Sequence, residues 1–118
     1  MKHRFTNPKH YPRALLIDID GTVLKHDFNN DGFEAIKGAV DWVNEKYKTH
    51  GIFFFTSRLE VDREITEQTL KQHGFKYDAI IFGKPYSDYV VHIDDRKFKS
   101  VTVPRDVGVM AVTDDDLT

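Results

Sequence analysis

The sequence predicts an α/β fold, a Rossmann-like three-layer α/β/α sandwich around a mainly parallel five-stranded sheet. Short, unbroken apolar runs alternate with segments of helical periodicity, and most of the apolar runs end abruptly in polar residues. This alternation is typical of βαβ units, whose parallel strands are buried on both faces. Right-handed crossovers then place the carboxyl ends of the strands along one edge of the sheet.

Length and composition predict a single globular domain over residues 1–118, with a basic arm at 1–13 and an acidic tail at 114–118. Hydrophobic residues make up 40% of the chain, and its net charge of −2 gives no general case for nucleic-acid binding. No apolar run could span a membrane and no signal-like segment opens the chain, so we expect a cytoplasmic protein without a membrane partner. Because cysteine is absent, any metal must be held by oxygen or imidazole.

The first predicted strand lies in the stretch from Ala14 to Leu24. Its apolar run ends in Asp18 and Asp20, followed by a Gly-Thr pair. Ligand sites in open α/β sheets lie just beyond the carboxyl ends of strands. We therefore expect these two carboxylates to lie where a reaction takes place.

Two helices are predicted after this strand. The first spans about 33–50 and has an Asp31–Glu34 pair that resembles a capping box. Its apolar residues recur at three- and four-residue intervals: Phe33, Ile36, Val40, Val43 and Tyr47. The second helix spans about Val61 to His73 and ends at Gly74, with a weaker stripe of Val61, Ile65 and Leu70.

Four further apolar runs are predicted to be strands: Ile52–Phe55, Ala79–Phe82, Val90–Ile93 and Val107–Val112. The first three of these, like the initial strand, end in side chains suited to phosphoryl chemistry. After the initial Asp18 and Asp20, these are Thr56, Ser57 and Arg58, then Lys84, then Asp94 and Asp95. Carboxylates meeting at one edge would repel by about 4 kcal/mol per pair at ~4 Å and an effective dielectric near 20. A hard divalent cation such as Mg²⁺ would offset that repulsion and would neutralise an incoming phosphate.

These segments together resemble the haloacid dehalogenase (HAD) superfamily of phosphohydrolases. The resemblance rests on four motifs in order: Asp-Ile-Asp-Gly-Thr at 18–22, Phe-Thr-Ser-Arg at 55–58, Gly-Lys-Pro at 83–85 and Ile-Asp-Asp-Arg at 93–96. It implies a HAD-like fold in which Asp18 attacks phosphorus and Asp20 is the general acid and base. Thr56 and Lys84 would bind the phosphoryl group. Mg²⁺ would be held by Asp18, by the backbone carbonyl of Asp20, and by Asp94 or Asp95, either of which can be the direct ligand.

The remaining candidate contacts have two interpretations. Ser57 and Arg58 are candidate substrate-binding residues beside Thr56. For Arg58 and Arg96, a structural ion pair is as good an explanation as a phosphate contact.

The resemblance leaves the substrate open. The segment His73–Arg96 is similar to small capless members associated with sugar-phosphate metabolism, which implies a phosphatase acting on a sugar phosphate. Ile-Asp-Asp-Arg also resembles the phosphatase domain of phage polynucleotide kinase, so a nucleic-acid 3′-phosphatase is an alternative. Phospho-accepting receiver domains use similar residues around Mg²⁺, but their acid pair comes first in the chain, whereas here it comes last.

No insertion large enough for a cap domain is present. Residues 23–32 offer a short flap carrying Phe28, and Lys84 follows the third strand almost at once. We therefore expect either a large substrate that covers the site itself, or a homo-oligomer in which a neighbouring subunit covers it.

Overall fold

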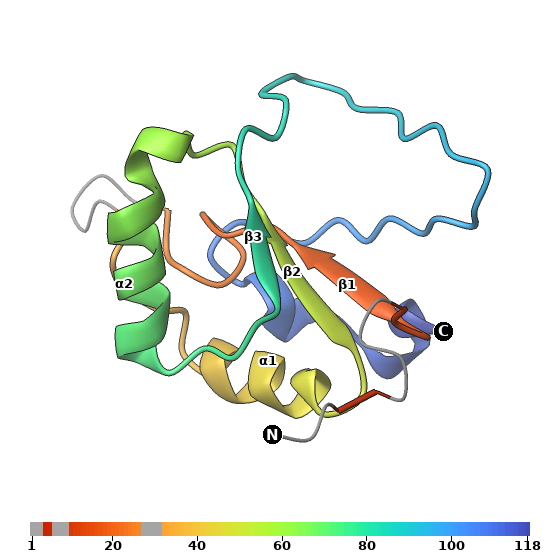
Figure 1. The fold of residues 1–118 in the computed structure, drawn as a ribbon, viewed down its shortest axis with the longest axis horizontal. Helices are drawn as coiled ribbons and strands as arrows, with labels where there is room; N and C mark the ends of the chain where they lie inside the picture. Colours follow the sequence, from red (N-terminus) through yellow and green to blue (C-terminus); the bar gives the residue numbers. More distant parts are fainter. Residues whose placement is uncertain (1–3, 6–9, 27–31) are drawn as a thin grey trace.

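The computed structural model describes residues 4–5, 10–26 and 32–118 (Figure 1). Three features predicted from the sequence therefore lie outside the described residues: the flap residue Phe28, the capping residue Asp31, and most of the basic arm, including Lys2 and Lys9. No helix in the described ranges is both long enough and apolar enough to cross a membrane.

The centre of the fold is a parallel sheet with the order β1-β2-β3. These strands span Ala14–Ile17, Gly51–Phe55 and Ala79–Ile81, so the first three predicted strands are confirmed to within a residue. The described part of the chain holds three strands and not the five that were predicted. The α/β class is confirmed at this coarser level, and β1 is left as an edge strand.

Two α-helices connect the strands. Helix α1 spans Ala39–Tyr47, and α2 spans Arg63–His73 after a short 3₁₀ helix, η1, at Glu60–Asp62. Helix α2 ends directly before Gly74, as predicted. Its apolar stripe is only partly confirmed, because Leu70 is fully buried whereas Val61 is 85% exposed.

Helix α1 begins later than the predicted start near residue 33. The amide of Lys25 donates to Glu34 O over 2.7 Å, and the amide of Ile36 donates to Val23 O over 2.9 Å. These hydrogen bonds pair residues 34–36 with the turn after β1. The backbone groups that take part in them are therefore not available for the hydrogen bonds of a helix that would start near residue 33. Phe33 is consequently exposed, whereas Ile36 and Val43 enter the core.

The two faces of the sheet differ in their cover. Residues in register point to the same face, and the row Ile17, Phe54 and Ile80 is buried together with side chains of α1 and α2. On the opposite face, Leu16 is 48% exposed and Ile81 is 44% exposed. Within the part of the chain that the structure describes, the predicted second helical layer is therefore not seen over this face.

The predicted strand Val90–Ile93 is not formed. Residues 82–103 contain neither helix nor strand, and Figure 1 shows them as a long excursion beyond β3 that returns towards the C-terminal segment. Val90 is 59% exposed and Ile93 is 92% exposed. An apolar run favours a strand, but a strand also needs to lie beside another strand, and here the run lies apart from the sheet.

The prediction of a strand at Val107–Val112 is wrong. The centre of this segment forms a 3₁₀ helix, η2, at Gly108–Ala111. The reason is a tertiary bond: the amide of Val109 donates to Thr22 O over 3.0 Å, which ties this segment to the turn after β1 instead of to a sheet.

Both predicted tails contain ordered contacts. The acidic tail forms a further 3₁₀ helix, η3, at Asp114–Leu117, with Thr113 and Asp116 making a capping box. In the basic arm, Arg4 forms an ion pair with Asp78 at 2.8 Å, so at least this arm residue is part of the folded structure.

Candidate active site

The candidate site is built on the turn that follows β1. Asp18 and Asp20 are separated by Ile19, which is fully buried and thereby anchors the turn in the core. The amides of Thr22, Val23 and Leu24 all donate to Ile19 O over 3.0–3.2 Å. This compact turn leaves the side chains of Asp18 and Asp20 partly accessible, at 35% and 26% exposure.

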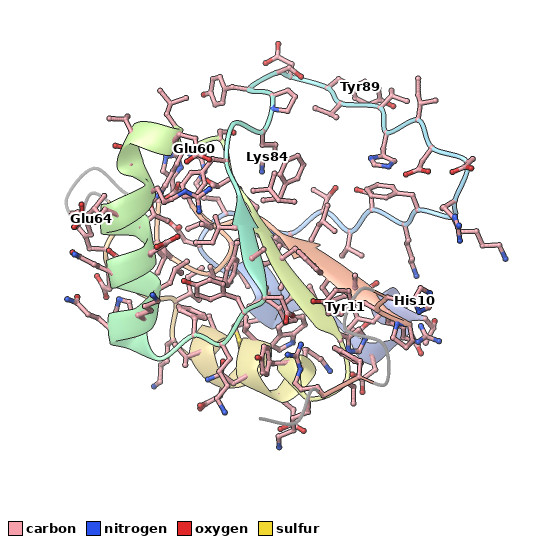
Figure 2. All side chains as sticks on the ribbon, in the orientation of Figure 1. His10, Tyr11, Glu60, Glu64, Lys84 and Tyr89 are labelled. Atoms are coloured by element: carbon pink, nitrogen blue, oxygen red, sulfur yellow. The ribbon has the colours of Figure 1, made fainter. Side chains whose placement is uncertain are left out.

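Lys84 lies against Asp18. Its Nζ donates to Asp18 Oδ1 over 2.7 Å, and Thr22 Oγ1 donates to Asp18 Oδ2 over 3.1 Å. The backbone amide of Lys84 donates to Thr56 O over 2.8 Å, which fixes the residue beside the end of β2. Figure 2 shows Lys84 close to the carboxyl end of β3. Asp18 is therefore contacted by residues from two separate strand ends.

Arg58 holds Asp20 in a two-point contact. Its Nε donates to Asp20 Oδ2 over 2.9 Å, and its Nη2 donates to Asp20 Oδ1 over 2.7 Å. The same guanidinium donates to Thr66 Oγ1 and to Gly32 O. Parallel bonds of this kind fix the plane of a carboxylate as well as its position.

Thr56 and Ser57 lie at the turn that follows β2. Thr56 is 1% exposed, and its hydroxyl oxygen accepts a bond from the amide of Arg58 over 3.1 Å. Because a hydroxyl can accept and donate at once, this contact still lets the Thr56 hydroxyl hydrogen point elsewhere. Ser57 is half-buried beside it.

Asp94 and Asp95 are not brought to this site. Both are exposed in the 82–103 excursion. Asp94 Oδ2 lies 3.2 Å from His92 Nε2, and Asp94 Oδ1 accepts from the amide of Arg96. The hydrogen bond with His92, followed by that from Arg96, lowers the pKa of Asp94. Among the described residues, no three His, Asp or Glu side chains are grouped so as to hold a metal ion.

The structure thus brings together five of the predicted site residues: Asp18, Asp20, Thr56, Arg58 and Lys84. It also adds three that the sequence did not single out as site residues: Thr22, Gly32 and Thr66. Thr22 lies inside the first motif, so its spacing from Asp18 was a usable signal. Gly32 and Thr66 reach the site through tertiary contacts that no local pattern reports.

The two carboxylates of the site each form an ion pair with one basic side chain. Each of the two carboxylates has one cation within 2.7 Å, Lys84 for Asp18 and Arg58 for Asp20. A carboxylate beside an ammonium group and a threonine hydroxyl is an arrangement that can receive a phosphoryl group, because the donors can turn towards phosphate oxygens.

Comparison with known protein families finds no match, and comparison with curated proteins finds none either. Among solved structures, the crystal structure of a target protein from Vibrio cholerae is similar to this chain, with a TM-score of 0.59. The two chains are 19% identical, and the similarity covers 89% of this chain and 93% of the other. At this level of identity the similarity concerns the fold alone, and it supports the α/β architecture.

Proposed function

We propose that this chain is a HAD-type phosphatase that hydrolyses phosphate monoesters with the help of Mg²⁺. One observation carries the proposal: the Asp18 carboxylate lies 2.7 Å from Lys84 Nζ at the carboxyl edge of the sheet, with Asp20 two residues away. A nucleophile, a phosphate-binding cation and a second carboxylate are the groups that phosphoryl transfer through an enzyme ester requires.

The proposed reaction has two steps. In the first, an Asp18 oxygen attacks phosphorus, the bond from phosphorus to the ester oxygen breaks, and Asp20 gives its proton to the departing alcohol. In the second, Asp20 takes a proton from water, the water oxygen attacks phosphorus, and the bond to Asp18 breaks to release phosphate. Lys84 and the Thr56 hydroxyl hold the phosphate oxygens in both steps.

The chemistry of the donors fits Mg²⁺. Mg²⁺ is bound in proteins through one or two carboxylates together with other oxygen ligands, and one turn supplies the Asp18 carboxylate and the backbone carbonyl of Asp20. When bound, the ion would neutralise charge on the phosphate. Asp94 or Asp95 would add a second carboxylate if the segment before them lay against β1.

We propose that Val90–Ile93 pairs with the free edge of β1. The edge is available because, among the described residues, β1 pairs with β2 alone. The run is apolar and highly exposed, and covering it would remove apolar surface from water. Since Asp94 follows Ile93 as Asp18 follows Ile17, a parallel in-register pair would place the two carboxylates on neighbouring strands about 5 Å apart.

Hydrogen exchange tests this pairing directly. Amides of Val90–Ile93 should exchange at least tenfold more slowly than those of the exposed residues Tyr86–Tyr89 in the same excursion. Equal exchange in the two stretches would show that the fourth strand does not form, and Asp94 and Asp95 would then have no route to the metal.

For the substrate we favour a sugar phosphate, and a 3′-phosphorylated nucleic-acid end is the alternative. The described residues show no cap over Asp18 and Lys84, whose side chains keep 35% and 27% exposure. Such an uncovered site is expected either to bind a large substrate that covers it, or to be covered by a neighbouring subunit. A receiver-like role as a phospho-acceptor without turnover would appear as stable phosphorylation of Asp18.

A phosphate-release screen tests the proposed function. It should span sugar phosphates, nucleotides and 3′-phosphorylated oligonucleotides, with Mg²⁺ and with EDTA. We expect turnover that requires Mg²⁺ and disappears in Asp18→Asn, a change that keeps the volume of the side chain. Asp41→Asn, on the surface of α1, is the matched control and should keep full activity. If Asp18→Asn is as active as the parent, Asp18 is not the nucleophile.

A further inference from the structure

The Arg58 guanidinium has four hydrogen bonds to the protein itself. Two go to Asp20, at 2.9 and 2.7 Å, one goes to Thr66 Oγ1 at 3.1 Å and one to Gly32 O at 3.0 Å. The Arg58 side chain is only 14% exposed. It therefore joins three segments that are distant in sequence: the turn after β1, the stretch before α1, and α2.

These contacts decide between the two interpretations that the sequence leaves open for Arg58. A guanidinium has five N–H groups, and four of those in Arg58 are already directed at protein oxygens. At most one is left for a substrate. Lys84 has three N–H groups on one nitrogen and donates a hydrogen bond to Asp18, so it has more capacity than Arg58 to bind phosphate.

We propose that Arg58 is a positioning residue that holds the Asp20 carboxylate in the orientation needed for proton transfer to the leaving group. This inference rests on the proposed function, because it assigns a task to Arg58 only if Asp20 is the general acid. The fork of two parallel bonds fixes both the position of Asp20 and the plane of its carboxylate. Thr66 and the Gly32 carbonyl in turn fix the plane of the guanidinium.

Gly32 offers an independent way to disturb this pair. A Cβ at position 32 would lie 2.5 Å from Arg58 Nη2 and 2.8 Å from Asp20 Oδ1, which is closer than such atoms approach. Gly32 also has a φ of +76°, a conformation that other residues rarely adopt. Gly32→Ala therefore displaces the pair while leaving both of its charges in the protein.

The test compares two esters that differ in their need for a proton. An alkyl phosphate needs Asp20 to protonate its leaving alcohol, whereas p-nitrophenyl phosphate has a stable leaving anion. In single-turnover release of the leaving group, Arg58→Met should slow the alkyl ester by about 100-fold, because a misplacement of about 1 Å costs that much. The nitrophenyl ester should lose less than tenfold. Gly32→Ala should show the same selective loss.

The double variant Asp20→Asn with Arg58→Met adds a second criterion. If Arg58 acts through Asp20, the double variant is no slower on the alkyl ester than Asp20→Asn alone. Arg63→Met is the matched control, because Arg63 also makes a two-point contact, with Glu60, but lies at the start of α2 away from these carboxylates. It should leave both esters unaffected.

Equal slowing of both esters by Arg58→Met, or multiplied losses in the double variant, would overturn the positioning role and indicate a phosphate contact. Urea unfolding of each variant identifies one that does not fold. If Arg58→Met does not fold, Gly32→Ala, which retains the guanidinium, decides between the positioning role and a phosphate contact. A parent that hydrolyses neither these esters nor any compound of the phosphate-release screen would overturn the proposed function and this role with it. An active parent with equal losses overturns the role of Arg58 alone.

Discussion

Lys84 Nζ donates to Asp18 Oδ1 over 2.7 Å, so the cation that follows β3 forms an ion pair with the carboxylate that follows β1. In the proposed reaction the same ammonium must also bind the phosphate. Lys84 has N–H groups to serve both, since Asp18 Oδ1 takes only one of the three. In the structure the charges of Asp18 and Lys84 offset each other. In the proposed reaction, the Lys84 ammonium would contact both Asp18 and the phosphate.

Lys84→Met should weaken phosphate binding and strengthen metal binding. A hydrogen bond to a charged group contributes about 1.5–3 kcal/mol, which corresponds to an increase of about 10- to 140-fold in the inhibition constant of inorganic phosphate. Mg²⁺ affinity, measured by calorimetry, should rise because Asp18 loses its competing cation. Lys71→Met, on α2 outside this cluster, is the control. Unchanged phosphate inhibition in Lys84→Met would remove Lys84 from the phosphate site.

Asp20→Asn should slow turnover by about 10²- to 10⁴-fold, the usual contribution of a general acid and base. Because the second step also needs Asp20, phosphorylated enzyme should accumulate and be detectable as an increase in intact mass after rapid quenching. If the variant instead turns over normally once Mg²⁺ is raised, the role of Asp20 is confined to metal binding.

Arg4→Met should lower the free energy of unfolding by about 1–3 kcal/mol, the cost of leaving a partly buried charged partner without its bonds. Arg4 donates twice to Asp78, and its guanidinium carbon lies 3.4 Å from the Tyr47 ring centroid. Asp78 also accepts from the amide of Ile52, so its displacement would disturb the start of β2. Urea unfolding measures the change, with Lys48→Met, an exposed helix-end variant, as control. Equal stability of the two variants would mean that the contacts of Arg4 contribute nothing.

Stability should rise with pH through the region just below 6.5, and His50 is the cause. Burial lowers the pKa of His50 below its ordinary value of 6.5, so the unfolded chain binds a proton more readily than the folded protein does. The contribution of neutral His50 is complete above the unfolded pKa and is lost as pH falls below it. Urea unfolding between pH 5.5 and about 7.5 should show this slope, and His50→Gln should flatten it. A slope of the same size in His50→Gln would assign it to other groups.

The sequence was sufficient where structure depends on local pattern. Three buried apolar runs became strands with parallel register, and Gly74 marked the end of α2. As a result, Asp18, Thr56 and Lys84 could be predicted to share one edge from strand ends alone. The proximity of Asp18 and Lys84 is confirmed by their ion pair.

The sequence was insufficient where tertiary partners decide. Val107–Val112 has the composition of a strand, but its backbone bonds to Thr22 and forms a 3₁₀ helix. Val90–Ile93 has equally strong strand character, yet no neighbouring strand pairs with it. For Arg58, the position in the motif indicated a cation near the site but not its two hydrogen bonds to Asp20. The direction of this long side chain also depends on its hydrogen bonds to Gly32 and Thr66, which no local pattern predicts.

Gly108 is far in sequence from Asp18, yet its own substitution is expected to disturb the turn that carries Asp18. A Cβ at this position would collide with the carbonyl oxygen of Thr22, within the turn that carries Asp18 and Asp20. In a library of all single substitutions selected for activity, position 108 should therefore be depleted as strongly as position 18, although it bears no reactive group. A search for essential residues based on chemistry alone would overlook it, whereas a search based on backbone proximity to the proposed nucleophile would find it.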